Sequence, residues 1–97
     1  MKSGSAEETK ILKWISEKAK EIAAAEKVLL FGSRARGDAL ERSDFDIAIV
    51  TNFPEKIELI KEEAENCPHT LLSFDIVDFK KTSGEFKKRI LAESIEI

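Results

Sequence analysis

The sequence predicts an α/β or α+β fold in which helices pack on one small mixed β-sheet. Three observations support this class. Helical spacing of apolar residues alternates along the chain with short continuous apolar runs, the helical segments separate the strands, and 97 residues suffice for one domain. The 42% apolar content is too high for a disordered chain. We therefore expect a single domain over residues 1–97.

Composition excludes several other classes of protein. The longest apolar run is far shorter than a membrane-spanning helix, and the N-terminal residues have no apolar core of a signal peptide. Cys67 is the only cysteine, so a disulfide scaffold is excluded. The net charge of −3 gives no basic field for nucleic acid, and we expect no direct nucleic-acid binding. A cytoplasmic location is expected.

The first predicted element is a helix over residues 6–25. Ser5 and Glu8 form a capping box, in which each side chain can satisfy a free backbone N–H at the start of the helix. The residues at helical spacing form one apolar face: Ile11, Ile15, Ala19, Ile22 and Ala23. Trp14 is expected in the core or at an interface.

Three apolar segments predict strands. Val28 to Phe31 is a short continuous apolar run that ends at a glycine, which is typical of a buried strand. Asp44 to Thr51 is rich in Ile and Val and predicts a second strand. Leu71 to Phe79 predicts the third.

Two more helices follow from capping signals. Pro54 suits a helix start, and the helix stops before Pro68. Its apolar stripe is Ile57, Ile60 and Ala64. Thr82 and Glu85 make a second capping box, which opens a last helix. The residues expected to face inward there are Phe86, Ile90 and Leu91.

The second strand carries two carboxylates on one face. Side chains alternate along a strand, so Asp44 and Asp46 project together, while Phe45, Ile47 and Ile49 project oppositely. On its own, Asp44 would suit a turn or a cap. As a pair the two groups repel each other unless a cation neutralises them, and Mg²⁺ is the usual oxygen-liganded partner.

The third strand offers another carboxylate. If it neighbours the second strand, Asp75 can join the Asp44–Asp46 pair. Three carboxylates on adjacent strands suit a site for two metal ions about 4 Å apart. Asp78 falls on the opposite face and is expected to be a solvated strand end.

A glycine turn follows the first strand. Backbone amides at Gly32 and Ser33 can form a phosphate-binding concavity, and the serine hydroxyl can donate to a phosphate oxygen. Three arginines add positive charge nearby: Arg34, Arg36 and Arg42. A Walker A motif is excluded, because Asp38 stands where its lysine must be.

The spacing of these groups resembles a known signature. The chain has a Gly-Ser pair at 32–33, followed after ten residues by Asp44-Phe45-Asp46. This order is similar to the G-S-x10-D-x-D pattern of the nucleotidyltransferase superfamily that includes DNA polymerase β. Segments 30–37 and 43–49 resemble its minimal nucleotidyltransferase (MNT) subfamily, and residues 74–78 resemble that subfamily's third-carboxylate strand. The resemblance implies a polymerase β-like nucleotidyltransferase fold.

The resemblance also implies a metal site. Asp44 and Asp46 would bind two Mg²⁺ ions, and Asp75 would bind the catalytic one and help deprotonate the acceptor hydroxyl. These three aspartates are thus the predicted catalytic residues and metal ligands.

The implied nucleotide contacts come from the glycine turn. Gly32 and Ser33 would contact the phosphates of a nucleoside triphosphate, while Arg34 and Arg36 are candidates either for the phosphates or for a partner. The implied reaction transfers a nucleoside monophosphate, with AMP from ATP preferred, to a hydroxyl. The residues themselves do not select ATP over other triphosphates.

Two functions remain open at this stage. One is the nucleotidyltransferase, whose activity could require a partner chain. The other is an antitoxin-like partner of a helical HEPN protein, which it would neutralise by complex formation or by AMPylation. Both can hold for one protein, and a homo-oligomer is compatible with either.

Overall fold

A four-stranded mixed sheet forms the centre of the fold. The computed structural model describes residues 6–97, and the strands are β1 (Lys27–Phe31), β2 (Phe45–Val50), β3 (Phe74–Asp78) and β4 (Ile95–Glu96). Their order in the sheet is β3-β2-β1-β4. β1 is antiparallel to β2 and to β4, whereas β2 and β3 are parallel. The predicted α+β class with one mixed sheet is confirmed.

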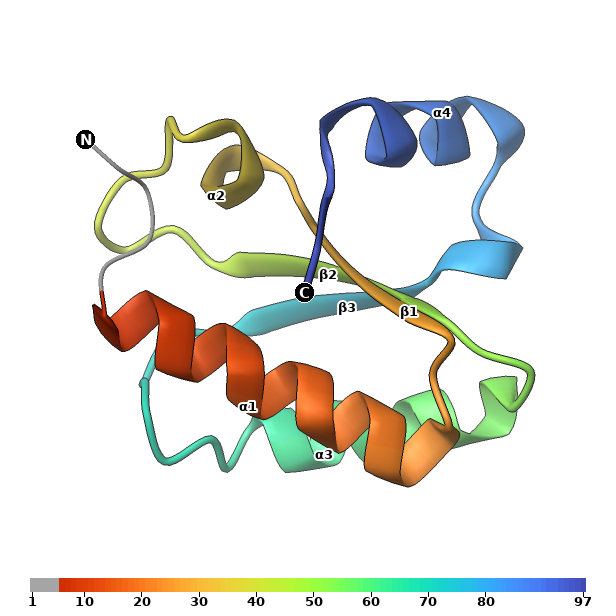
Figure 1. Ribbon diagram of the computed structural model, residues 1–97, viewed down its shortest axis with the longest axis horizontal. Helices are drawn as coiled ribbons and strands as arrows, with labels where there is room; N and C mark the ends of the chain where they lie inside the picture. Colours follow the sequence, from red (N-terminus) through yellow and green to blue (C-terminus); the bar gives the residue numbers. More distant parts are fainter. Residues whose placement is uncertain (1–5) are drawn as a thin grey trace.

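Helices cover both faces of this sheet (Figure 1). α1 (Ala6–Ala23) and α3 (Ile57–Ala64) lie on one face, and α4 (Gly84–Glu93) lies on the other. The short α2 (Ser33–Arg36) follows β1 directly. Two 3-10 turns, η1 (Pro54–Lys56) and η2 (Phe79–Lys81), precede α3 and α4. None of the helices described is long and apolar enough to cross a membrane.

Alternation along β2 divides the apolar residues into two cores. Phe45, Ile47 and Ile49 are almost wholly buried in the larger core, against α1 and α3. Ala48 points the other way, into a smaller core that includes Ile90 of α4. The strand is therefore covered on both sides, and Asp46 near its start is only half-buried.

The third strand is shorter than predicted. β3 begins at Phe74, and Leu71 is fully exposed in the loop before it rather than part of the sheet. Trp14 packs on Phe74, with ring centroids 6.5 Å apart, at the edge of the larger core. The strand β4 was not predicted, because two residues are too few to show an alternating pattern.

The predicted cap of the last helix is wrong by one residue. The Ser83 hydroxyl, not that of Thr82, accepts the hydrogen bond from the Phe86 N–H, at 3.2 Å. Thr82 instead donates to the Phe79 carbonyl that ends η2. Leu91 is 61% exposed rather than buried, because only Ile90 on this helix reaches the sheet fully. The Ser5 half of the first capping box lies outside the described residues.

The packing of α3 predicts a difference between two neighbouring residues. Ile60→Ala should lower the free energy of unfolding by about 2–5 kcal/mol, because Ile60 is completely buried and its loss leaves a cavity. Leu59→Ala is the matched control and should change it by less than about 0.5 kcal/mol, since Leu59 is exposed on the same helix. Urea unfolding followed by circular dichroism measures both. Equal losses would contradict the placement of α3.

Candidate active site

Two of the predicted carboxylates meet where three strands run side by side. Asp46 on β2 lies opposite Asp75 on β3 and, on its other side, opposite Phe31 at the end of β1. Both aspartates lie on the α4 side of the sheet, because Ala48 and Val77, two residues further along each strand, pack into the smaller core. The expectation that the third strand neighbours the second is therefore confirmed.

The charges around Asp46 work against its ionised form. Its pKa is raised above the usual 3.8, first by burial and then by repulsion from the carboxylates of Asp75 and Asp44. Glu93 adds a further repulsion, and the guanidinium of Arg36 opposes these effects. Asp44 itself precedes β2 and is exposed. Several carboxylates thus act on the half-buried Asp46. We call the part of the sheet that holds Asp44, Asp46, Asp75 and Glu93 the corner, and its negative charges outnumber the positive charge of Arg36.

Gly32 lies directly against the Asp46 carboxylate. A Cβ placed on Gly32 would overlap that carboxylate, so no other residue fits without displacing it. The backbone of Gly32 has φ 77° and ψ −157°, a region that is essentially restricted to glycine. Its N–H donates to Glu93 Oε2 at 2.7 Å. The turn after β1 therefore sets the Gly32 backbone against the Asp46 carboxylate, while its N–H is bonded to Glu93.

Arg34 is turned away from these carboxylates. Its guanidinium donates to the carbonyls of Ser43 and Glu41 and, at 3.0 Å, to the carboxylate of Glu8 on α1. It also stacks over the Phe45 ring, 4.3 Å from the centroid. Arg34 thus ties α2 to α1 and to the start of β2. Its contact with phosphates stays a prediction, and its observed partners are structural.

Arg36 faces the carboxylates instead. Its Nη1 lies 3.2 Å from Glu93 Oε1, and its Nε donates to Asp38 Oδ2 at 3.2 Å. Ser33 begins α2 and is half-buried beside the turn, whereas Arg42 is exposed in the loop before β2. Of the three arginines near the turn, Arg36 is the one placed to meet an anion at this site.

No local pattern in the chain points to Glu93 as a site residue. It lies 61 positions from Gly32 and follows the apolar pattern of the last helix, where an acidic residue is ordinary. Only the return of α4 across the sheet brings its carboxylate to the turn.

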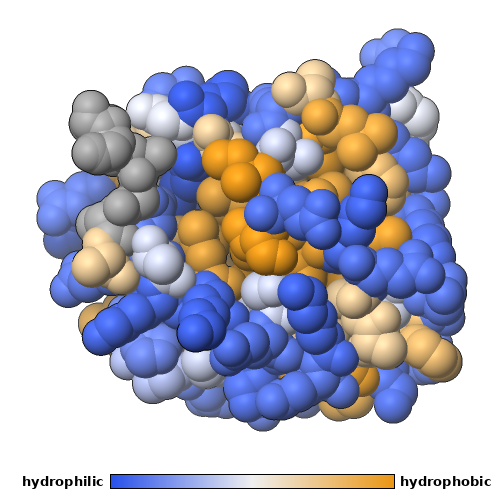
Figure 2. Space-filling view, viewed as in Figure 1, coloured by the Kyte–Doolittle hydropathy of each residue, from blue (hydrophilic) through white to orange (hydrophobic). Residues whose placement is uncertain are grey.

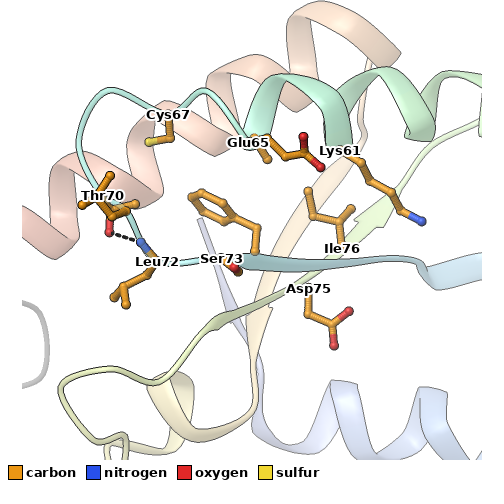
Figure 3. A pocket seen from close by; sticks show the side chains of 11 residues that line it. Lys61, Glu65, Cys67, Thr70, Leu72, Ser73, Asp75 and Ile76 are labelled. Carbon is orange, nitrogen blue, oxygen red and sulfur yellow. Dashed lines mark hydrogen bonds between the residues drawn. The ribbon is translucent and has the colours of Figure 1, made fainter.

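A pocket on the other side of β3 is separate from this corner. It has a volume of about 460 Å³, and its lining includes Lys61, Glu65, Cys67, Thr70 and Ile76. Figure 3 shows Asp75 pointing from β3 toward the α4 side, away from Lys61 and Glu65. Asp75 borders the pocket but directs its carboxylate to the face that holds Asp46.

The donor chemistry of the corner suits a hard divalent cation. Carboxylate oxygens are the ligands that Mg²⁺ prefers, and a cation would relieve the repulsion that raises the pKa of Asp46. Within residues 6–97, no three Asp, Glu, His or Cys side chains gather closely enough to hold a metal ion as they stand.

The fold and this corner define a class of small α+β domains in which a glycine turn faces strand carboxylates. The chain belongs to the family described as "Polymerase beta, Nucleotidyltransferase", whose profile matches residues 10–97. No curated protein matches the chain.

Solved structures share this fold. A structure described as that of a minimal nucleotidyltransferase is 26% identical, with a TM-score of 0.67 over 91% of this chain and 94% of its own. A nucleotidyltransferase from Sulfolobus solfataricus is 25% identical, with a TM-score of 0.56 over 99% and 89%. A toxin-antitoxin structure with AMP-PNP has a TM-score of 0.69 over 90% and 69%, and its 17% identity shows the fold alone.

Two glycines near the site provide a matched test of the contact with Asp46. Gly32→Ala should lower the free energy of unfolding by more than about 3 kcal/mol, because both the backbone angles and the overlap with Asp46 oppose it. Gly37→Ala should cost only about 1–2 kcal/mol, since its φ is also positive but nothing lies within 4 Å. Chemical unfolding measures both. A cost at Gly32 no larger than at Gly37 would refute the contact.

The raised pKa of Asp46 predicts that Asp46→Asn stabilises the protein at neutral pH in a buffer containing EDTA. The native state holds this proton at a higher pH than the unfolded chain does, so unfolding free energy falls as pH rises through the native pKa. The variant removes that loss, and its Tm should exceed that of the wild type at pH 7. The gain should shrink as pH falls toward 3.8. A lower Tm for the variant at pH 7 would contradict the repulsion.

Proposed function

We propose that this protein is a Mg²⁺-dependent nucleotidyltransferase and that residues 1–97 form one minimal nucleotidyltransferase domain. It would move a nucleoside monophosphate, most simply AMP from ATP, to a hydroxyl of an acceptor. The contact of Gly32 with Asp46, beside Asp75 in register on β3, carries this proposal. This contact supports the proposal, because a main-chain N–H suits a phosphate and carboxylates suit the metal of a metal–nucleotide complex. Family membership supports the same reaction class.

Each residue of the corner then has a distinct task. The Gly32 N–H and the Arg36 guanidinium bind non-bridging oxygens of the triphosphate, with Ser33 beside them. Asp44 and Asp46 orient the metal-bound triphosphate. Asp75, on the open edge strand of the sheet, faces the side from which an acceptor can approach.

The reaction is a displacement at the α-phosphorus. The acceptor oxygen forms a bond to that phosphorus while the bond to the bridging oxygen breaks and pyrophosphate leaves. The hydroxyl proton passes to a carboxylate oxygen of Asp75. Mg²⁺ held by the three aspartates would supply charge neutralisation of the triphosphate and a lower pKa of the acceptor hydroxyl. The chain's own contribution is to hold the reacting groups in line.

A protein partner is the second part of the proposal. The toxin-antitoxin structure with AMP-PNP supports both a nucleotide and a partner for this fold. The partner class we propose is a helical HEPN protein, which the chain would neutralise by binding or by AMPylation. A contact surface is available: Figure 2 shows an apolar area in the middle of one face, with hydrophilic residues below it. The exposed apolar residues of α4 and β4 include Leu91 and Ile95.

The proposal is tested by replacing the paired carboxylates. The protein is incubated with Mg²⁺, ATP labelled at the α-phosphate, and the protein encoded by its neighbouring gene. Wild type should transfer label to that protein, and Asp44→Asn with Asp46→Asn should reduce transfer by about a hundredfold or more, because the metal-bound triphosphate is no longer oriented. Partner capture in a pull-down should be unchanged.

Asp78→Asn is the control for this experiment. Asp78 lies on the same strand as Asp75 but caps η2 through the Lys80 N–H, which asparagine can also do. Its variant should transfer label like the wild type. Transfer that survives the double substitution would refute the site. If the wild type captures the partner but transfers no label, binding of the partner is the only one of the two functions that stands.

A further inference from the structure

Glu93 occupies the donors that the proposed function gives to the nucleotide. Its Oε2 accepts from the Gly32 N–H at 2.7 Å, and the Arg36 Nη1 lies 3.2 Å from Oε1 and 3.4 Å from Oε2. The Glu93 side chain is only 18% exposed, although it is the last residue of a surface helix. We call the Gly32 N–H and the Arg36 guanidinium the donor pair.

The donor pair selects an oxyanion by its chemistry. Main-chain N–H and guanidinium groups form short, charge-assisted bonds equally well with carboxylate and phosphate oxygens. A carboxylate seated on both groups shows that they can converge on one anion. Glu93 also lies close enough to Asp46 to add to its repulsion, so it places negative charge where a triphosphate would place its own.

The backbone of Glu93 is fixed from the C-terminal side. The next residues form β4, in which Ile95 pairs with Leu30 of β1, and the Ile97 N–H donates to the Val28 carbonyl at 2.9 Å. The Ser94 N–H closes α4 on the Ile90 carbonyl at 2.8 Å. Release of the donor pair therefore needs only rotation of the Glu93 side chain, without unfolding of α4.

We propose that Glu93 is an internal ligand of the donor pair, which a triphosphate oxygen displaces, so that Glu93 sets the affinity of the site for nucleotide. This inference rests on the proposed function and concerns its regulation. If the pair is free for about one tenth of the time, the apparent Kd for nucleotide is about tenfold above its intrinsic value.

The test is nucleotide binding by Glu93 variants of the full chain. The probe is α,β-methylene-ATP with Mg²⁺, which binds without transfer, and isothermal titration calorimetry gives its Kd. Glu93→Gln removes the charge, and Glu93→Ala removes the side chain. Both should lower Kd about tenfold relative to wild type. Glu96→Gln, an exposed residue of β4, removes the same charge three positions away and should leave Kd unchanged.

Displacement has its own spectroscopic signature. In wild-type protein with ¹³C-labelled glutamate carboxyls, the Glu93 carboxyl resonance, assigned with Glu93→Gln, should move to the position of solvent-exposed glutamates when the probe saturates. Melting curves report whether each variant is folded, and Glu93→Gln covers the case in which Glu93→Ala is not.

Each outcome decides the inference. An unchanged or raised Kd in both Glu93 variants overturns it, as does an equal gain in Glu96→Gln, which would mean simple long-range repulsion. A static Glu93 resonance at saturation also overturns it. In all of these cases the wild type still binds the probe. If neither the wild type nor any variant binds the probe, the proposed function fails, and the inference fails with it.

Discussion

The close approach of Gly32 to the Asp46 carboxylate is the contact on which the rest of the site depends. A side chain at position 32 would overlap the Asp46 carboxylate, so the turn after β1 and Asp46 could not both keep their places. The antiparallel pairing of β1 with β2 sets Phe31 opposite Asp46, and the positive φ of Gly32 turns the chain that follows into α2. Backbone geometry, rather than any single polar side chain, therefore brings the glycine turn and the carboxylates together.

The site brings together carboxylates that do not stabilise the fold. Asp46 is held half-buried among other carboxylates, and the resulting rise of its pKa is a cost in stability at neutral pH. The two apolar cores, one on each face of β2, offset that cost. Arg36 and Glu93 complete the arrangement as a neutralising cation and an anion that keeps the donors satisfied. A local loss of stability is common at sites that are arranged to bind a ligand.

Predictions from local pattern succeeded where one periodic signal decided the outcome. The alternation from Asp44 to Thr51 placed Asp46 opposite the apolar residues of its strand, and the structure agrees. Patterns failed where two candidates lay close together. Thr82 and Ser83 both suit a helix cap, and only the geometry of η2 assigns them. The arginines of α2 are alike in sequence, but Arg34 packs into the protein while Arg36 faces the carboxylates.

The sequence alone determined the class of fold, the carboxylate of Asp46 on β2 and the glycine turn, because period, spacing and glycine content are properties of neighbouring residues. The tertiary structure decided that Asp75 stands beside Asp46, because strand order is not written in any single strand. It alone brought in Glu93, which reaches the Gly32 amide from the end of a distant helix. Contacts between residues so far apart depend on how the helices close over the sheet, and no local pattern records that closure.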